Sequence, residues 1–359
     1  MKEPRGSGVR SRGSSEVSIH GTIACVPTLS RLLFFGTPAF AVPTLAALVG
    51  AGRAPLLAVT QPARPVGRGR GVAEPPVARW AAEHGIAVEQ PERVRDPAFV
   101  AALRELAPDA AVVVAFGQIF PPDLLALPAL GCINLHASLL PRYRGAAPIQ
   151  AALAAGEAAT GVTAMRMEAG LDSGPILLQE EVAIGPRETA GELRVRLAAT
   201  GARLVLETLA RLERGDLLPR PQDAALATYA PRLTRASGAA DWSLPAPALF
   251  ARLRAYTPWP GMTAELRGQP VKILWGEPLA AGDLARLTAS EAVDLDGLGG
   301  AAPGTVLGVV GGWIAVACGG ATALGLERLQ RPGKPPRAAA DFANGERLRA
   351  GERFVQRAG

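Results

Sequence analysis

The amino-acid sequence predicts an α/β protein in which a doubly wound parallel sheet is followed by a small β-barrel. In the first two thirds of the chain, short apolar segments of strand length alternate with helical segments, which is typical of a parallel sheet covered by helices on both faces. In the last third, short strand-like segments are separated by glycine turns, which is typical of an antiparallel barrel. A chain of 359 residues is long enough to give each domain its own core.

The strands of the first domain are predicted from short apolar runs. Four runs are expected to form the parallel sheet: residues 32–35, 56–59, 110–114 and 132–135. Two further strands are expected at 160–167 and 176–182, on either side of a glycine-rich loop. Four helices are expected to include residues 45–49, 76–84, 99–106 and 189–212. Since 132–135 would be a central strand, its carboxyl end is where such a sheet binds ligands.

The second domain is predicted to follow a segment with scattered proline and charge. Its expected strands are residues 263–266, 271–275, 304–310, 313–318 and 323–329. Residues 279–302 are an Ala/Gly/Leu/Asp-rich insert that we expect to be a mobile loop. The predicted division of the chain is a disordered extension at 1–29, a sheet domain at 30–213, a linker at 214–237 and a barrel domain at 238–359.

Composition argues against several classes of protein. The longest apolar stretch, residues 110–116, is much shorter than the roughly 18 residues of a membrane span, so we expect a cytoplasmic protein. It would be organellar if the Arg- and Ser-rich extension is a transit peptide rather than the product of an upstream start site. Three scattered cysteines argue against disulfides and a zinc site, and we expect chemistry without a metal. A lone Gly36 after the first strand is not a dinucleotide-binding glycine pattern.

Two polar residues mark the end of the strand predicted at 132–135. Asn134 and His136 are two positions apart, and alternation along a strand places both side chains on one face, where they can point at the same atom. Such an amide and imidazole suit acyl chemistry, in which an oxyanion must be stabilised. An isolated pair of this kind is more often structural, with the asparagine holding a turn and the histidine bonded to a backbone carbonyl.

The residues that follow this pair resemble those of the folate-dependent formyltransferases. In that family an Asn-x-His segment is followed by Ser-Leu-Leu-Pro, and an essential aspartate comes later in the chain. Here the corresponding residues are Asn134, His136, the segment Ser138, Leu139, Leu140 and Pro141, and Asp172, which lies 36 residues after His136 within Gly-Leu-Asp-Ser-Gly. The three-part match favours a catalytic interpretation over the structural one.

The resemblance implies a Rossmann-like formyltransferase domain that uses 10-formyltetrahydrofolate as formyl donor. It implies that Asn134, His136 and Asp172 are catalytic and that Ser138, Leu139, Leu140 and Pro141 form a folate-binding turn. Formyl transfer to an amine passes through a tetrahedral oxyanion, and each donor aimed at that oxygen contributes about 3 kcal/mol. The Asp172 carboxylate would orient His136 and favour its protonated form. Ser138 is offered no base in a triad pattern, so we do not expect a serine nucleophile.

The resemblance is closest to family members that formylate methionyl-initiator tRNA. Three further parts support this: Phe-Gly-Thr-Pro-x-Phe at 35–40, an Arg/Gly loop at 60–69, and Asp-Trp-Ser with Pro-Trp-Pro-Gly at 241–243 and 258–261. In those members the loop enters the acceptor arm, and an OB-like C-terminal domain holds the inner side of the tRNA. We therefore expect Arg64, Arg68 and Arg70 to bind tRNA, and the protein to be a monomer.

A local cluster of positive charge supports tRNA binding better than the net charge of the whole chain does. Of the net +6, half lies in residues 1–31, where five basic residues outnumber two acidic ones. In contrast, no acid lies between Gln61 and Val72, so the arginines of this glycine-rich segment can follow phosphates. Taken alone, the cluster could equally be a solvated basic loop.

Other acceptors and classes of function remain open at this point. A formyltransferase that acts on a sugar amine or glycinamide ribonucleotide would share the Asn/His/Asp site, as would a formyltetrahydrofolate hydrolase. A catalytically idle RNA-binding module would use the barrel and the basic loop alone. The family usually has acids where Ala39, Ala63 and Pro175 stand, which puts local loop geometry in doubt but removes no chemical group.

Overall fold

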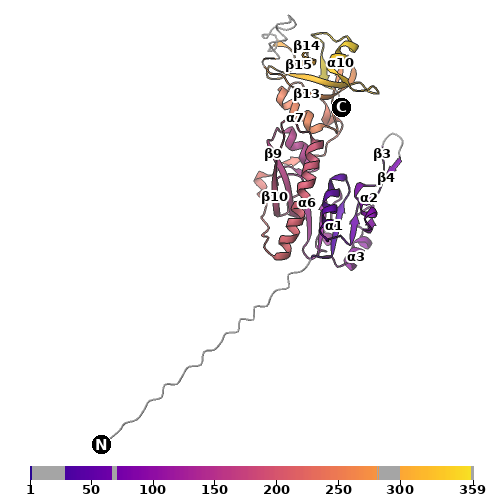
Figure 1. Cartoon of the computed structure of the whole chain (residues 1–359), viewed down its shortest axis with the longest axis vertical. Helices are drawn as coiled ribbons and strands as arrows, with labels where there is room; N and C mark the ends of the chain where they lie inside the picture. Colours follow the sequence, from indigo (N-terminus) through magenta and orange to yellow (C-terminus); the bar gives the residue numbers. More distant parts are fainter. Residues whose placement is uncertain (2–28, 67–70, 281, 283–299, 357–359) are drawn as a thin grey trace.

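The structure is a computed structural model that describes residue 1 and residues 29–66, 71–280, 282 and 300–356. The predictions made for residues 2–28, for Arg68 and Arg70, and for most of the 279–302 insert therefore lie outside the described residues. Figure 1 shows two domains, with α7 beside the junction. Leu29, which the sequence prediction placed in the extension, is instead 1% exposed, and its amide donates to Glu213 Oε1 at 2.8 Å.

The first domain confirms the predicted α/β class. Among the described residues, seven strands form its main sheet, in the order β10-β9-β7-β6-β1-β2-β5. Their bounds are β1 Leu32–Gly36, β2 Leu57–Val59, β5 Val88–Glu89, β6 Ala110–Val114, β7 Cys132–His136, β9 Ala159–Arg166 and β10 Ile176–Ala183. The five neighbouring strands β5, β2, β1, β6 and β7 are parallel. In contrast, β9 runs antiparallel to β7, and β10 runs antiparallel to β9. The loop between β9 and β10 is too short for a parallel crossover.

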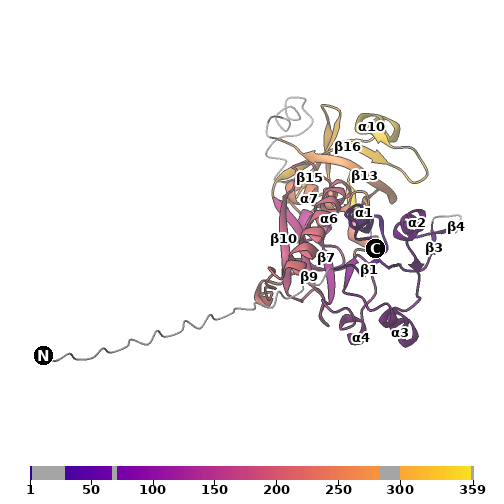
Figure 2. The same ribbon diagram turned by 60° about the horizontal axis from the view of Figure 1, so that its bottom comes forward.

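Helices cover both faces of this sheet, as Figure 2 shows. Their bounds are α1 Val42–Gly50, α2 Pro76–Glu83, α3 Pro97–Glu105, α4 Pro122–Leu125, α5 Pro148–Ala154 and α6 Ala190–Arg214. Leu32 and Phe34 of β1 belong to the core under α1, α2 and α6, whereas Leu33 and Phe35 belong to the core under α3 and α4. Because successive side chains of a strand point to opposite faces, a strand buried on both faces is apolar throughout.

The segment predicted as a linker is hydrogen-bonded to the first domain. Its short strand β11 (Tyr229–Ala230) pairs in parallel with β8 (Arg144–Gly145), and Arg220 forms an isolated bridge with Ile176. It also contains the 3₁₀ turn η2 at Ala224–Leu226. This segment therefore runs along the turn that follows β7. In the earlier Arg/Gly loop, β3 (Arg64–Val66) and β4 (Gly71–Ala73) form an antiparallel hairpin.

The second domain is a curled antiparallel sheet. Its strands among the described residues are β12 Met262–Leu266, β13 Gln269–Pro278, β14 Val306–Val310, β15 Trp313–Cys318, β16 Thr322–Gln330, β17 Arg337–Ala338 and β18 Phe354–Gln356. Backbone bonds close the two edges, since the Val306 amide donates to the Glu352 carbonyl at 2.7 Å and the Phe354 amide to the Gly304 carbonyl at 2.8 Å. The domain also contains two helices that were not predicted from the sequence, α7 (Ala246–Tyr256) and α10 (Ala339–Glu346).

The two domains meet through α7. This helix packs against α5, and Arg254 Nη1 donates to the carbonyl of Gly185 at 3.1 Å. Burial lowers the pKa of the Arg254 guanidinium. Within the described ranges, no helix has both the length and the apolar character needed to cross a membrane.

Candidate active site

A cavity of about 730 Å³ opens at the carboxyl ends of β1, β6 and β7. The chain runs outward from β1 through β2 to β5 and then crosses to β6 on the other side of β1, so the topology switches between β1 and β6. In open α/β sheets, ligands bind beside such a switch point. The cavity lies there, with Pro38–Phe40 after β1 and Phe116–Phe120 after β6 in its wall. Its volume is in the range of small-molecule sites, roughly 300–1,000 Å³.

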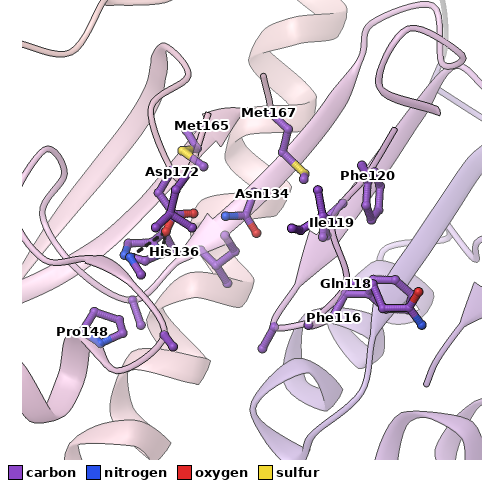
Figure 3. A pocket seen from close by; sticks show the side chains of 18 of the residues that line it. Phe116, Gln118, Ile119, Phe120, Asn134, His136, Pro148, Met165, Met167 and Asp172 are labelled. Atoms are coloured by element: carbon purple, nitrogen blue, oxygen red, sulfur yellow. Dashed lines mark hydrogen bonds and ion pairs between the residues drawn. The ribbon is translucent and has the colours of Figure 1, made fainter. Parts of the chain in front are cut away.

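Asn134 and His136 both line the cavity, as the alternation of β7 predicts. Ile133 and Leu135 face the core on the opposite side of the sheet. Figure 3 shows the Asn134 amide pointing between the His136 side of the cavity and the Phe116–Phe120 side. Within the described part of the chain, this amide has no hydrogen-bond partner. It is therefore available to a bound molecule.

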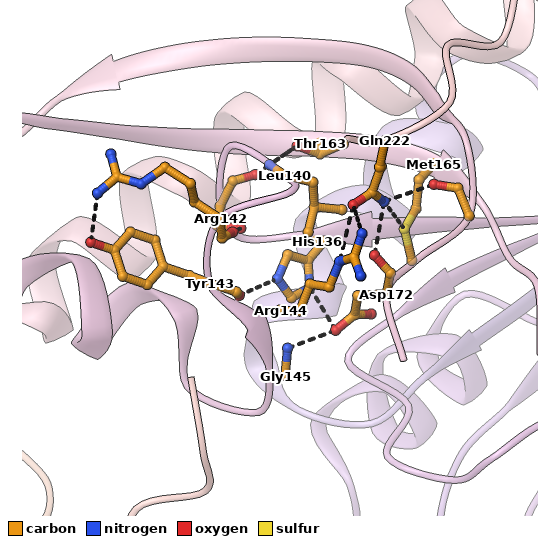
Figure 4. A network of polar contacts seen from close by, with 12 residues as sticks. His136, Leu140, Arg142, Tyr143, Arg144, Gly145, Thr163, Met165, Asp172 and Gln222 are labelled. Atoms are coloured by element: carbon orange, nitrogen blue, oxygen red, sulfur yellow. Dashed lines mark hydrogen bonds and ion pairs between the residues drawn. The ribbon is translucent and has the colours of Figure 1, made fainter. Parts of the chain in front are cut away.

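His136 is held from both sides of its ring. Its Nε2 lies 2.9 Å from the carbonyl oxygen of Tyr143, and Nδ1 lies 3.6 Å from Asp172 Oδ2 (Figure 4). A carbonyl can only accept, so Nε2 carries a proton and donates it. The longer distance at Nδ1 is beyond hydrogen-bond length, and this nitrogen faces both the carboxylate and the cavity. When His136 is protonated, Nδ1 therefore has a proton to offer to a bound molecule.

Asp172 reaches the site from the loop between β9 and β10. Its backbone has φ of +48°, a left-handed conformation that few residues other than glycine adopt but that aspartate tolerates. Its Oδ2 accepts a hydrogen bond from the Gly145 amide at 2.8 Å, and its side chain is 14% exposed. The structure thus brings together the three residues that the sequence analysis assigned to catalysis.

The predicted folate turn, Ser138–Pro141, does not line this cavity. Ser138 Oγ donates to the Arg142 carbonyl at 2.6 Å, and Leu140 is buried against Met165 and Ile176. In this position the turn supports the segment that carries the Tyr143 carbonyl. Its contact with a folate stays a prediction.

The phenol of Tyr143 anchors the same turn. It donates to Glu157 Oε1 at 2.6 Å, and Arg142 forms an ion pair with the same carboxylate. Burial, together with this hydrogen bond, raises the pKa of Tyr143 to about 12, so the phenol remains a neutral donor at physiological pH. The Tyr143 carbonyl, which accepts from His136, is thereby fixed in place.

The apolar wall of the cavity was not identified from the sequence. It includes Phe116, Phe120, Met165 and Met167, and two apolar side chains at its edge are strongly exposed: Ile119 at 91% and Leu171 at 63%. The sequence could have indicated this wall, because residues 116–120 follow the buried strand 110–114 and loops at that edge of the sheet form the binding site.

The described residues include one of the three arginines expected to bind tRNA. Arg64 is exposed on β3, at one end of the hairpin, and does not line the cavity. Arg68 and Arg70 lie outside the described residues. Of the cysteines, Cys132 and Cys318 are buried, and burial raises the pKa of each thiol to about 12. Neither therefore has the low pKa of a nucleophilic thiol.

The network around Asp172 makes Gly145 sensitive to substitution. Gly145 has φ of +114°, and a Cβ added there would lie 2.7 Å from the Ala230 carbonyl oxygen. We expect Gly145→Ala to displace the amide that donates to Asp172 and to lower kcat at least tenfold, because a displacement of about 1 Å costs up to 100-fold.

Steady-state kinetics tests this expectation, with Gly50→Ala as the matched control. A Cβ at Gly50, in α1, meets no atom of the described residues within 4 Å, so this variant is expected to keep its activity. Parental kcat in Gly145→Ala would show that the turn tolerates the change and does not need this backbone conformation.

Comparison with known proteins identifies the family. The formyl transferase family matches residues 30–209, and the formyl transferase C-terminal domain matches residues 232–347. The methionyl-tRNA formyltransferase of Anaeromyxobacter dehalogenans (strain 2CP-C) is 49% identical over 317 residues, which cover 88% of this chain and 97% of that protein. That of Aromatoleum aromaticum is 44% identical over 324 residues, covering 90% and 96%.

Solved structures of lower identity share the fold. HypX from Aquifex aeolicus in complex with tetrahydrofolic acid matches with a TM-score of 0.56 at 15% identity, over 88% of this chain and 47% of that one. WlaRD, a sugar 3N-formyl transferase solved in the presence of dTDP and 5-N-formyl-THF, matches with a TM-score of 0.58 at 14% identity, over 86% and 100%. On the strength of the sequence matches, this chain belongs to the formyl transferase family and, within it, to the methionyl-tRNA formyltransferases.

Proposed function

We propose that this protein transfers the formyl group of 10-formyltetrahydrofolate to the α-amino group of methionyl-initiator tRNA, for the initiation of translation. The observation that carries the proposal is the Asn134 amide, which has no hydrogen-bond partner among the described residues and lies beside the His136–Asp172 pair, in one cavity of a chain that matches these enzymes over both domains. The sugar-amine, glycinamide-ribonucleotide and hydrolase alternatives share the site, but the identity of 49% and 44% to two methionyl-tRNA formyltransferases, over 88% and 90% of this chain, favours the charged tRNA as acceptor.

The proposed reaction needs a donor for developing negative charge. The amine nitrogen attacks the formyl carbon, a new C–N bond forms, and the carbonyl oxygen becomes an oxyanion. The bond from that carbon to N10 then breaks, and the proton lost by the amine ends on N10. We assign the Asn134 amide to the oxyanion because it faces the cavity and makes no competing hydrogen bond to any of the described residues.

His136 is the second proposed donor. With Nε2 donating to the Tyr143 carbonyl, only Nδ1 can act on the substrate. The Asp172 carboxylate, 3.6 Å from Nδ1, lies on the other side of the ring from the Tyr143 carbonyl and limits the rotation of the imidazole. After it has donated to the oxyanion, the same nitrogen can help move the amine proton toward N10.

We propose that the donor occupies the apolar part of the cavity, between Phe116–Phe120 and Met165–Leu171. Flat ring systems are bound by such apolar walls with a few polar groups. The predicted contact with Ser138–Pro141 is retained as part of this proposal. It is supported by the position of that turn next to His136 in the chain.

The basic hairpin and the second domain are proposed to hold the tRNA. In this proposal residues 30–213 catalyse, 214–237 connect, and the OB-like domain at 238–359 binds the inner side of the tRNA. The exposed Arg64 on β3 supports the assignment of Arg64, Arg68 and Arg70 to phosphate contacts. Such contacts add affinity that falls as the salt concentration rises.

Replacing Arg64 and Arg68 together by alanine is expected to raise the KM for charged tRNA about tenfold and to leave the KM for the donor unchanged. The increase in the KM for charged tRNA should be smaller at low salt. The slope of log affinity against log salt should fall in magnitude by about 2, one for each phosphate contact. Steady-state kinetics gives the two KM values, and filter binding over a salt series gives the slope.

The matched control is Arg203→Ala, on α6. Arg203 pairs with Glu180 of the edge strand β10, and the hairpin lies on the other side of the domain (Figure 1). We expect its tRNA kinetics to match the parent. Equal effects on the KM for charged tRNA in Arg203→Ala and in the Arg64/Arg68 variant would show that the hairpin is not part of the tRNA interface.

The acceptor itself is tested by a direct competition. Methionyl-initiator tRNA, glycinamide ribonucleotide and an amino-sugar nucleotide are offered separately with 10-formyltetrahydrofolate, and a fourth reaction contains buffer alone. The proposal requires kcat/KM to be highest for the charged tRNA by orders of magnitude. Rapid formate release in buffer alone would instead establish a hydrolase.

A further inference from the structure

Gln222, in the segment between the two domains, contacts the Asp172 loop directly. Its Nε2 donates to the carbonyl oxygen of Asp172 at 2.8 Å and to that of Gly174 at 2.7 Å (Figure 4). Gln222 lies 50 residues after Asp172 in the chain. One side-chain amide thus ties together two backbone carbonyls of the loop that carries the catalytic carboxylate.

Arg144 fixes the orientation of this amide. Its Nε and Nη2 lie 3.1 and 2.7 Å from Gln222 Oε1, and the Arg144 side chain is buried, with a residue exposure of 7%. A guanidinium can only donate, so the oxygen of the amide must face it and the NH₂ group must face the two carbonyls. Both ends of Gln222 are therefore satisfied in one orientation only.

Through these contacts Gln222 joins the two segments that carry His136 and Asp172. Arg144 directly follows Tyr143, whose carbonyl accepts from His136, and directly precedes Gly145, whose amide donates to Asp172. The Asp172 backbone, at φ +48°, is in a conformation that persists when neighbouring groups hold it. Gln222 makes two of the contacts that hold this loop.

Thr228, later in the segment that connects the two domains, contacts the turn that contains Tyr143 and Arg144. The Tyr143 amide donates to Thr228 Oγ1 at 2.8 Å, and the Arg144 amide donates to the Thr228 carbonyl at 2.8 Å. The segment that leads to the second domain is therefore built into the wall behind the His136–Asp172 pair.

We propose that Gln222 is a positioning residue for formyl transfer, which acts by holding the Asp172 carboxylate against His136 and so makes the connecting segment part of the active site. This inference rests on the proposed function. Gln222 does not line the cavity and is assigned no contact with substrate.

The test is a double-mutant cycle with Gln222→Leu and Asp172→Ala, measured as single-turnover formyl transfer to charged initiator tRNA. We expect Gln222→Leu to lower the rate constant about 100-fold in the parent, with the KM of either substrate changed less than about twofold, because a misplaced catalytic group costs this much. In the Asp172→Ala background the same substitution should cost less than about twofold, since the group it positions is gone.

Two further variants test whether the orientation of the Gln222 amide is what matters and whether a neighbouring substitution has the same effect. Gln222→Glu keeps an acceptor for Arg144 but turns a carboxylate oxygen toward the two carbonyls, so it should be at least as impaired as Gln222→Leu. Asp223→Ala, at the next residue, loses a local bond to the Ala225 amide, which is the one hydrogen bond of that side chain within the described ranges, and should retain parental activity. Circular dichroism on heating confirms that each variant is folded.

Equal losses from Gln222→Leu in both backgrounds would overturn the inference, because they would show an effect that does not pass through Asp172. Parental activity in Gln222→Leu would overturn it as well. An inactive parental protein would instead overturn the proposed function, which keeps the two failures apart.

Discussion

Asn134→Ala is expected to lower kcat for formyl transfer 100- to 1,000-fold while the KM for the donor changes little. The amide points into the cavity with no partner in the described part of the chain, so its donor capacity serves what binds there. Loss of one oxyanion donor costs about 3–4 kcal/mol in the transition state and little in the ground state. Steady-state kinetics with charged initiator tRNA measures both constants.

Asn344→Ala is the matched control, since Asn344 is exposed on α10 of the second domain and should leave kcat unchanged. Asn134→Asp adds a second comparison, because it keeps the shape but replaces the NH₂ donor by an acceptor. It should be as impaired as the alanine variant. Near-parental kcat in either Asn134 variant would be incompatible with an oxyanion role for this residue.

Asp172→Ala is expected to have the larger effect, about 1,000-fold on kcat. It removes the carboxylate beside Nδ1 of His136 and also leaves the Gly145 amide without its acceptor. Asp172→Asn separates the two losses, because its side-chain oxygen can still accept from Gly145 but carries no charge. If the negative charge that faces Nδ1 of His136 takes part in the reaction, the asparagine variant should be nearly as slow as the alanine variant. Rapid-quench kinetics gives the rate of the chemical step for both.

Asp216→Ala serves as the control for loss of a carboxylate elsewhere. Asp216 is paired with Arg214 and Arg211 on the surface, where such pairs contribute little, and kcat should be that of the parent. Donor binding by the Asp172 variants, followed by intrinsic fluorescence, should remain close to parental. Full activity in Asp172→Asn would show that the carboxylate charge has no part in the reaction.

Much of the sheet could be predicted because its central strands are buried on both faces. A strand such as β6, in which all five residues are buried, appears in sequence as an uninterrupted apolar run between polar turns. The helices of the second domain were harder to predict. In α7, Leu249 and Leu253 have helical spacing, but the run begins and ends among prolines and lies within a series of strand-like segments. Local pattern alone does not separate the two.

The residues of the site also differ in how far they could be predicted, because some are close in the sequence and others are brought together by the fold. Asn134 and His136 are adjacent on one strand face, so alternation was enough to bring them together. Asp172 was found through the resemblance, because no local rule places a residue from another loop opposite His136. Gln222 was not found, since it comes from a segment that resembles a linker in composition and is held at the site by the pairing of β11 with β8 and by the bridge between Arg220 and Ile176.

The most direct test of the account is to identify the product. The parental protein is incubated with 10-formyltetrahydrofolate and charged initiator tRNA, the aminoacyl ester is hydrolysed, and the released amino acid is analysed by mass spectrometry. We predict N-formylmethionine in an amount equal to the tetrahydrofolate formed. Unmodified methionine, with the formyl group recovered as formate or on another acceptor, would contradict the account.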